Sequence, residues 1–400
     1  MWDVTPSLSR LEESISDPTS PIGLRMRAAY FLKQVYMDNN TDTNTDSNKK
    51  DIQERVIASL SRGLKDTRHG SLLRHEYAYV MGQLRDVRCC PVLEDIVTST
   101  TDCAMVRHEA AEALAAIGSP SSRDVLQQVL ESTRDSIPEL YETCLVALNV
   151  MDWRLEDHSE NNEQEEPVGC ACMMNPYSSV DPAPPHPSHA KMSLEQLGDL
   201  LCDSSQSIFD RYRAMFSLRN RGGEDAVQQL CRALPLVDTT QTTTTQPTSA
   251  LLRHEVAYVL GQLQHVASID ALEQSLRNTH EHTMVRHEAA EALGAMDDVT
   301  AWNRVEAILQ EFTNDSNPVV RESCLVALDA ADYWGHTNNH DDSSQEDKEE
   351  EEEDQQVINP RISSFAKEKA TGLPMETTTA NNNNKNSNGI LQNHFNIQAN

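Results

Sequence analysis

Four copies of the dipeptide His-Glu, each preceded by arginine, constrain the fold of this chain more than any other feature. The copies are His75-Glu76, His108-Glu109, His254-Glu255 and His287-Glu288. The first two histidines lie 33 residues apart, the last two lie 33 residues apart, and the two pairs are displaced by 179 residues. This spacing identifies the chain as an internally duplicated repeat protein.

The repeat length predicts the fold class. Apolar residues recur at helical spacing after each motif, as at Val80, Leu84 and Val87. A period near 33 residues is one helix–turn–helix unit, and stacked units bury the faces that no single unit can bury. The ankyrin and tetratricopeptide signatures are absent from the sequence, and the Ala-Leu pairs resemble a short HEAT repeat. We therefore predict an all-α, HEAT-like helical-hairpin solenoid, with eight repeats in two pseudo-symmetric halves of four.

Composition divides the 400 residues into segments. Two low-complexity stretches, 39–50 and 239–248, are predicted to be solvated loops at equivalent joints of the two halves. The segment from 156 is acidic and then Pro-rich, and the residues after 336 are acidic and then Asn-rich. The predicted division is an N-terminal repeat half (1–155), a linker (156–192), a C-terminal repeat half (193–336) and a disordered tail (337–400).

Charge and cysteine usage exclude several classes of partner. The net charge of −30 argues against a nucleic acid partner and favours a cationic one, although a large share of it lies in one run, 340–356. The nine cysteines lie mostly in apolar helical patterns and are typical of reduced thiols. Signal-peptide features and apolar runs of membrane-spanning length are both absent from the sequence. We expect a cytoplasmic, monomeric protein without a membrane partner.

The four His-Glu pairs predict a metal site. Adjacent helical residues point about 100° apart, and equivalent helices of neighbouring repeats lie roughly 10 Å apart, so two imidazoles can meet on one ion between them. Imidazole with carboxylate, without thiolate at equivalent positions, suits iron or manganese better than structural zinc. Converging carboxylates would also repel one another without cations, so two divalent ions, one for each half, are favoured.

The remaining repeats serve as a control for this interpretation. A single helical His-Glu is usually a surface pair, and repeat proteins also duplicate structural residues. The outer repeats lack the dipeptide, since the equivalent positions are Met26-Arg27, Glu142-Thr143, Tyr212-Arg213 and Glu322-Ser323. Arginine also occupies the position before the motif in three of these repeats, at Arg25, Arg211 and Arg321, so the motif arginines are predicted to form structural salt bridges. Gly82 and Gly261 are predicted to allow close helix packing.

These motifs resemble the deoxyhypusine hydroxylase family, the HEAT-repeat di-iron monooxygenases. The resemblance extends over roughly residues 20 to 335. Besides the four His-Glu pairs it includes Asn175-Pro176-Tyr177, Val180 to Pro185, Phe209 to Asn220, Leu252 to His265 and Met284 to Ala295. It implies two Fe²⁺ per chain and O₂ as co-substrate. It also implies hydroxylation of the deoxyhypusine side chain of eukaryotic translation initiation factor 5A to hypusine.

The same resemblance implies roles for the eight motif residues. The iron ligands would be His75, His108, His254 and His287, with Glu109 and Glu288 as carboxylate ligands. Glu76 and Glu255 would be further metal ligands, or catalytic-site groups that hold the substrate amine.

Two other classes of protein remain open from the residues. A non-enzymatic HEAT scaffold would explain the repeats but not the selective placement of His-Glu, and measured iron would decide against it. A chromophore-lyase-type repeat protein would bind a bilin pigment through cysteine, and a bound pigment would favour it.

Overall fold

The computed structural model describes residues 6–39, 47–159, 175–177, 179–235 and 249–337, and these form helices joined by short turns. The helices of the first half are α1 (Leu8–Ser16), α2 (Ile22–Asp38), α3 (Ser47–Lys65), α4 (Gly70–Leu84), α5 (Cys90–Thr98), α6 (Ala104–Ile117), α7 (Ser122–Thr133) and α8 (Pro138–Ser159). Those of the second half are α9 (Leu194–Cys202), α10 (Ile208–Arg221), α11 (Gly223–Cys231), α12 (Ala250–Leu263), α13 (Ile269–Arg277), α14 (Thr283–Gly294), α15 (Val299–Phe312) and α16 (Pro318–Thr337). Short 3₁₀ turns include η2 (Val87–Cys89), η4 (Pro187–Lys191) and η5 (Val266–Ser268).

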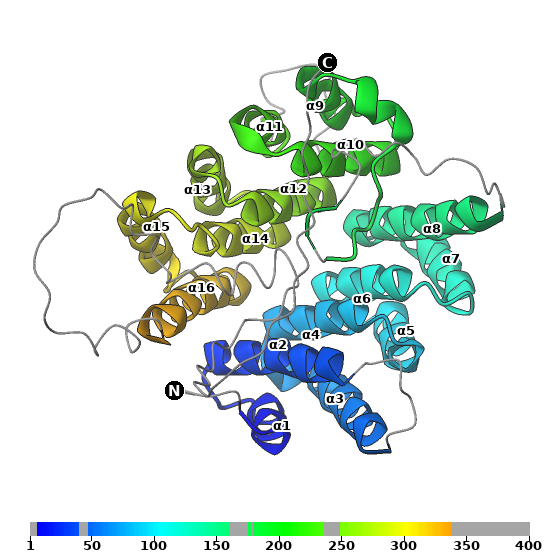
Figure 1. Ribbon diagram of the computed structural model, residues 1–400, viewed down its shortest axis with the longest axis vertical. Coiled ribbons are helices and arrows are strands. Elements are labelled where there is room, and N and C mark those ends of the chain that lie inside the picture. Colours follow the sequence, from blue (N-terminus) through cyan, green and yellow to red (C-terminus); the bar gives the residue numbers. More distant parts are fainter. Residues whose placement is uncertain (1–5, 40–46, 160–174, 178, 236–248, 338–400) are drawn as a thin grey trace, which may run out of the picture.

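The helices form two concentric layers. The even-numbered helices lie inside and the odd-numbered helices lie outside, with the first half opposite the second (Figure 1). Along the inner layer α4 packs on α6, α8 on α10 and α12 on α14, and α16 packs back on α2. The inner layer therefore closes on itself, and both halves present inner helices to a common centre. This arrangement confirms the all-α, HEAT-like solenoid, while the count of eight repeats stays a prediction.

Glycine brings the motif helices close together, as predicted. A Cβ on Gly82 would lie 2.8 Å from the Cα of Ala113, and one on Gly261 would lie 3.1 Å from the Cα of Ala292. Because these contacts are with backbone atoms, the glycines set how closely α4 approaches α6 and α12 approaches α14. Gly82 and Gly261 are 179 residues apart, so both halves use the same device.

The arginines before the motifs are structural, as predicted. Nε of Arg74 donates to the carbonyl of Leu64 at 2.6 Å, and Nε of Arg286 donates to that of Leu276 at 2.9 Å. Ion pairs join Arg74 to Asp102, Arg253 to Glu281 and Arg286 to Asp315 at 2.5–2.7 Å. Each of these arginines therefore ties its inner helix to the end of the preceding outer helix, to the loop that leads into the next inner helix, or to both.

Two predicted loop regions contain ordered structure. Helix α3 begins at Ser47, inside the stretch 39–50 that composition assigned to a loop, because its polar first turn stays exposed while Val56 and Leu60 are buried. Helix α8 continues to Ser159, past the proposed boundary at 155. The stretch 239–248 and the tail after Thr337 lie outside the described residues.

Part of the predicted linker packs into the molecule. Residues 179–185, which we call the strap, contain the fully buried Ala183 and an ion pair between Asp181 and Arg219 at 2.6 Å. Polar and Pro-rich composition predicted a linker between the halves, and proline and a paired carboxylate let such a segment pack where no ladder of backbone hydrogen bonds is needed. The Nε of Arg213 donates to the Pro184 carbonyl at 2.9 Å, which holds the other end of the strap on α10.

Two of the cysteines in the apolar helical patterns lie in the core. Cys144 and Cys324 are fully buried, and burial raises the pKa of each thiol to about 12. Both are therefore protonated thiols in the helical core. Among the described residues, none of the helices has the length and apolar character needed to cross a membrane.

Candidate metal centre

All the residues of the four His-Glu pairs are buried on the inner helices. His75 and Glu76 lie on α4, His108 and Glu109 on α6, His254 and Glu255 on α12, and His287 and Glu288 on α14. None of the eight side chains is on the outer surface, which excludes the reading of surface ion pairs. The duplicated motif thus marks the inner wall of both halves.

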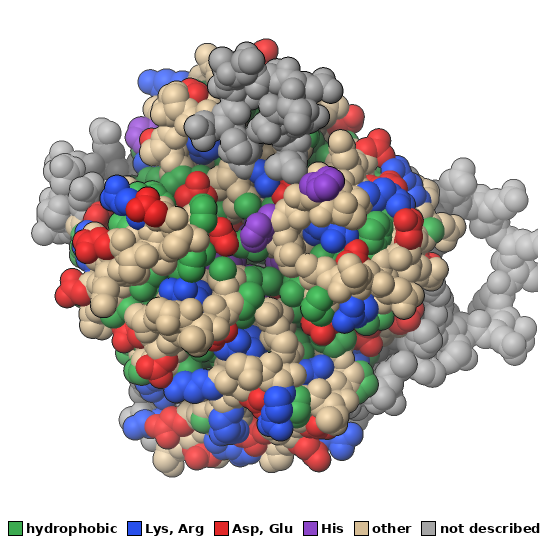
Figure 2. Space-filling model, turned by 180° about the vertical axis from the view of Figure 1, so that it is seen from behind, with side chains coloured by type: hydrophobic (Ala, Val, Ile, Leu, Met, Phe, Trp, Pro, Cys, Tyr) green, Lys and Arg blue, Asp and Glu red, His purple; other side chains and the backbone are tan. Residues whose placement is uncertain are grey.

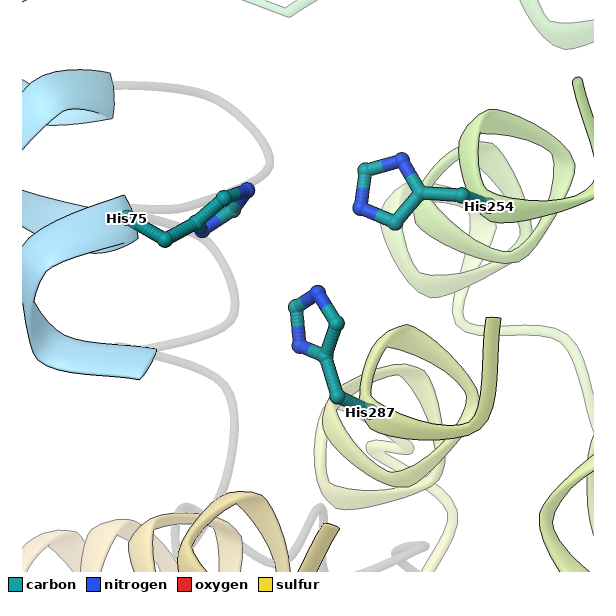
Figure 3. Close-up of side chains that lie close together, drawn as sticks. All are labelled: His75, His254 and His287. Atoms are coloured by element: carbon teal, nitrogen blue, oxygen red, sulfur yellow. The ribbon is translucent and has the colours of Figure 1, made fainter. Parts of the chain in front are cut away.

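The four imidazoles form one cluster between the halves. Within each half the ring centroids are 5.4 Å apart, for His75 with His108 and for His254 with His287. Across the halves the separations are as short, at 5.2 Å for His108 with His254 and 5.3 Å for His75 with His287. His75, His254 and His287 point toward a common space from α4, α12 and α14 (Figure 3). The two halves therefore contribute to one centre.

Two of the glutamates lie at equivalent positions beside these rings. Nε2 of His75 is 3.0 Å from Oε2 of Glu109, and Nε2 of His254 is 3.5 Å from Oε2 of Glu288. Each of these glutamates also lies 3.8 Å from Nε2 of the histidine that precedes it, His108 or His287. Each half thus presents two imidazoles around one carboxylate with nearly the same geometry.

Several groups of donor atoms are close enough to share one ion. The ligand atoms lie within 4.8 Å of one another in three sets: His75, His254 and His287; His75, His108 and Glu109; and His287, Glu288 and Glu291. The first set crosses the two halves, whereas the other two lie within one half. Nitrogen and carboxylate oxygen without sulfur are ligands suited to iron, manganese or zinc at a catalytic site.

The imidazoles of the cluster have different electrostatic environments. Burial and the nearby rings of His75 and His287 hold the pKa of His108 well below its usual range. Burial also acts to lower the pKa of His75, but the carboxylates of Glu109 and Glu76 outweigh it and raise that pKa well above its usual range. A neutral His108 has a lone pair available for a metal ion.

The donor atoms of His108 fit a bound cation. Both of its ring nitrogens are buried and lack a hydrogen-bond partner among the described residues. A buried nitrogen without a partner costs roughly 1–3 kcal/mol, so such groups need a compensating interaction. Coordination of a metal ion by these imidazoles would provide it.

The other two motif glutamates, Glu76 and Glu255, lie in different surroundings. Burial, then Glu112, Glu109 and Glu288, raise the pKa of Glu255 well above its usual range. The hydroxyl of Tyr30 donates a hydrogen bond of 2.7 Å to Oε2 of Glu76. A protonated amine would relieve the repulsion at Glu255, because it supplies positive charge inside the same cavity.

Three further duplicated pairs lie on the motif helices and were not among the predicted site residues. Glu112 and Glu291 follow Glu109 and Glu288 by three residues, and Oε1 of Glu291 lies 3.4 Å from Nδ1 of His287. The other two pairs are Tyr79 with Tyr258 and Gln83 with Gln262. The displacement of 179 residues was a sufficient signal for all of them. The stretches read His-Glu-Ala-Ala-Glu in α6 and α14, and His-Glu-x-Ala-Tyr-x-x-Gly-Gln in α4 and α12.

A cavity of about 50 Å³ adjoins the cluster and is lined by both halves and the strap. Its carboxylates are Glu76, Glu109, Glu112, Asp181, Glu255 and Glu288, and its basic lining residue is Arg154. Over the outer face drawn in Figure 2, by contrast, acidic and basic side chains are interspersed. The lining of the cavity is therefore more acidic than this face, and it would attract a cationic ligand.

The fold and this centre define a HEAT-repeat protein with a buried imidazole and carboxylate cluster able to hold metal ions. Family models agree on the repeats, since HEAT repeats match residues 57–139 and 242–329, and a PBS lyase HEAT-like repeat matches 210–234. A deoxyhypusine hydroxylase of Mus musculus is 40% identical over 326 residues, covering 82% of this chain and 92% of the mouse protein. That of Homo sapiens is 39% identical over 321 residues, covering 80% and 90%.

A solved structure agrees with these relatives. The structure of human deoxyhypusine hydroxylase in complex with glycerol matches with a TM-score of 0.63 and 38% identity, covering 80% of this chain and 94% of the human chain. The chain belongs to the deoxyhypusine hydroxylase family. The resemblance inferred from the sequence motifs is thereby confirmed.

Proposed function

We propose that this chain is a deoxyhypusine monooxygenase that converts the deoxyhypusine side chain of translation initiation factor 5A to hypusine, using O₂ and two Fe²⁺ ions. The names of its relatives support the reaction. The observation that carries the metal is the convergence of four buried imidazoles with centroids 5.2–6.0 Å apart from both halves of the chain. Neither a non-enzymatic scaffold nor attachment of a pigment to cysteine requires four buried imidazoles at one centre.

The ligands that we propose follow the duplication. One ion would be held by His75, His108 and Glu109. The other would be held by the equivalent His254, His287 and Glu288. The matching contacts of Glu109 with His75 and of Glu288 with His254 support this assignment over the set that crosses the halves. Two imidazoles and one carboxylate are the ligand set of many ferrous oxygenases.

Each remaining motif glutamate has a role in this proposal. Glu76 and Glu255 line the cavity and would hold the substrate amine. The hydrogen bond from Tyr30 fixes one carboxylate oxygen of Glu76 and so defines the orientation of that carboxylate. When bound, the iron pair would supply the activation of dioxygen and the insertion of one oxygen atom into a C–H bond, which no side chain provides. The protein's part is to position the cationic arm beside that centre.

Metal analysis tests this proposal. The purified protein should contain two irons per chain, and His108→Ala should lose most of the iron together with turnover. The control is His280→Ala, which removes an exposed histidine outside the cluster and should keep both. Full iron occupancy in the His108→Ala protein would refute the ligand assignment.

The substrate is tested by mass. With reductant and oxygen, the protein should add about 16 Da to the deoxyhypusine form of the factor, as expected for insertion of one oxygen atom at an iron oxygenase site. Free polyamines should react poorly, because binding of the surrounding protein surface contributes to recognition. Efficient oxidation of free spermidine without a mass gain on the factor would refute the substrate while leaving the metal site standing.

The division of the chain is part of the proposal. Halves 1–155 and 193–336 would carry the site, and the tail 337–400 would be dispensable because its composition offers little to bury. A chain ending at residue 337 should keep its iron content and its turnover. A loss of either would show that the tail contributes to the fold or to the site.

A further inference from the structure

Tyr79 on α4 and Tyr258 on α12 join the two halves beside the histidine cluster. Each follows a motif glutamate by three residues and therefore lies one helical turn further on the same face. Their hydroxyl oxygens are 3.2 Å apart, and their ring centroids are 6.5 Å apart. Both side chains line the cavity and are partly buried. The halves thus meet at two equivalent phenols.

The tyrosine pair is connected to the strap by hydrogen bonds. Nε2 of Gln262 donates to the hydroxyl of Tyr258 at 3.0 Å and to Oγ of Ser179 at 3.1 Å. Its equivalent in the first half, Gln83, accepts a hydrogen bond of 3.1 Å from the backbone N–H of Val180. One glutamine from each half therefore binds the strap. Because the strap lines the cavity, these hydrogen bonds fix the position of the cavity wall relative to the two tyrosines.

These residues form successive levels along α4 and α12. The tyrosines lie about 4.5 Å, and the glutamines about 10 Å, beyond the motif glutamates along the helix axis. A cationic arm lying in the cavity would meet Glu76 and Glu255 at its inner end and the two phenols at its middle. A deoxyhypusine arm has a primary amine at its tip and a secondary amine further back, separated by a short methylene chain. Its two amines therefore match the two levels.

The chemistry of the phenol pair matches the secondary amine. A secondary ammonium has two N–H groups, and the pair offers two phenolic oxygens that can each accept one hydrogen bond. The aromatic faces also attract a cation. The cavity of about 50 Å³ has room for roughly three to five waters, which is too little for the arm with dioxygen, so it has to widen. A neutral hydroxyl contact parts more readily than the charge-assisted bonds that hold the strap.

We propose that Tyr79 and Tyr258 form the subsite for the secondary ammonium of the substrate arm, with the hydroxyl pair parting so that each oxygen accepts one N–H. This inference rests on the proposed function and adds two positioning residues to it. In this inference the two phenols recognise the secondary amine of the arm, and the glutamates Glu76 and Glu255 bind its terminal primary amine.

Peptide binding to the iron-loaded protein without oxygen tests the subsite. One peptide carries the deoxyhypusine side chain, and the second carries an analogue with a methylene in place of the secondary amine. The native protein should bind the first peptide about tenfold more tightly. Comparison of two peptides with two proteins forms a double-mutant cycle, which resolves an effect of this size. In the Tyr79→Phe/Tyr258→Phe protein the two affinities should agree within about twofold, because only the hydroxyls have been removed.

Controls separate this subsite from a structural role. Both single variants and the double variant should keep full iron content and a melting temperature within about 2 °C of the native value, because one hydroxyl contact contributes only about 1 kcal/mol. Tyr77→Phe alters a buried tyrosine on α4 that does not line the cavity, so it should keep the tenfold preference.

Retention of the preference in the double variant would overturn the inference and leave the function standing. An equal loss of both affinities would overturn it too, since the phenols would then shape the cavity without reading the amine. If neither peptide binds the native protein and the factor gains no mass, the proposed function fails first.

Discussion

At the scale of single residues, Arg219 anchors the strap. The side chain is fully buried, and its two terminal nitrogens donate to the two oxygens of Asp181 at 2.7 and 2.6 Å. It also lies over the rings of Tyr177 and Phe216 at 5.0 and 4.7 Å. A planar guanidinium can make all these contacts at once, whereas a lysine ammonium cannot.

Replacement of Arg219 should therefore destabilise the protein strongly. We expect Arg219→Met to lower the free energy of unfolding by about 3–5 kcal/mol, because it leaves Asp181 nearly buried without its partner. The exposed pair of Arg123 and Asp152 is the matched control, and Arg123→Met should cost less than about 1 kcal/mol. Urea denaturation of both variants measures this, and equally small losses would contradict the role given to Arg219.

His189 makes stability depend on pH. Its Nδ1 lies 2.7 Å from Oγ of Ser217, and burial, with His186 and Arg213 nearby, lowers its pKa from 6.5 to about 4. The unfolded chain therefore binds more protons than the folded one between these values, and stability is lost as the pH falls from 6.5 toward 4. The loss from this group amounts to about 3 kcal/mol at most.

Unfolding at several pH values checks the contribution of His189. The His189→Gln protein should lose less stability than the native protein between pH 6.5 and 4, because glutamine does not titrate. His280→Gln, at an exposed position, should follow the native curve. Parallel curves for the native and His189→Gln proteins would show that His189 is not the group responsible.

At the scale of helices, Gly82 and Gly261 set the distance between neighbouring motif helices. Alanine favours a helix over glycine by about 1 kcal/mol, but a methyl group on Gly82 would overlap the backbone of Ala113. Overpacking costs about 1–3 kcal/mol, so Gly82→Ala should be destabilising on balance. It should also weaken iron binding, because α4 and α6 would move apart.

Gly198 provides the comparison for Gly82. A methyl group there would meet the ends of the flexible side chains of Gln229 and Arg232, which can move aside. Gly198→Ala should therefore be neutral or stabilising, and thermal unfolding with iron analysis of both variants distinguishes the two cases. A stable, fully loaded Gly82→Ala protein would show that the helix spacing at Ala113 can relax.

The helices also show what the sequence could predict. The 33-residue period and the helical spacing of apolar residues were enough for the solenoid, and the duplicated dipeptide was enough for the cluster. Glu112 and Glu291 could have been found by the same displacement, but a charged residue in a helix usually marks an exposed face. The composition of the stretch 179–185 could not show that it packs into the molecule, because its ion pair is with Arg219, which lies on another element.

At the scale of the whole molecule, the two halves are joined at both ends of the inner layer. Arg27 on α2 pairs with Asp329 on α16, and its guanidinium lies 4.4 Å from the ring of Tyr333. At the other junction Ser249 donates a hydrogen bond to Glu142. These contacts bring the halves to a common centre, and the sequence contained the duplication but no signal for which helices would meet.

Metal should add to these contacts, because each half contributes imidazoles and carboxylates to the same cluster. A ligand bound only by the folded state stabilises it by about 4 kcal/mol at a concentration a thousandfold above its Kd. Removal of iron should therefore lower the melting temperature by roughly 6 °C, at below about 2 °C per kcal/mol for a folded region longer than about 250 residues. It should also expand the molecule in solution scattering, because the carboxylates Glu109, Glu112, Glu255 and Glu288 would repel one another without the cations. The His108→Ala protein is the control, since iron should no longer shift its melting temperature or its radius of gyration. Identical scattering and melting curves for the native protein with and without iron would mean that the metal does not bridge the halves.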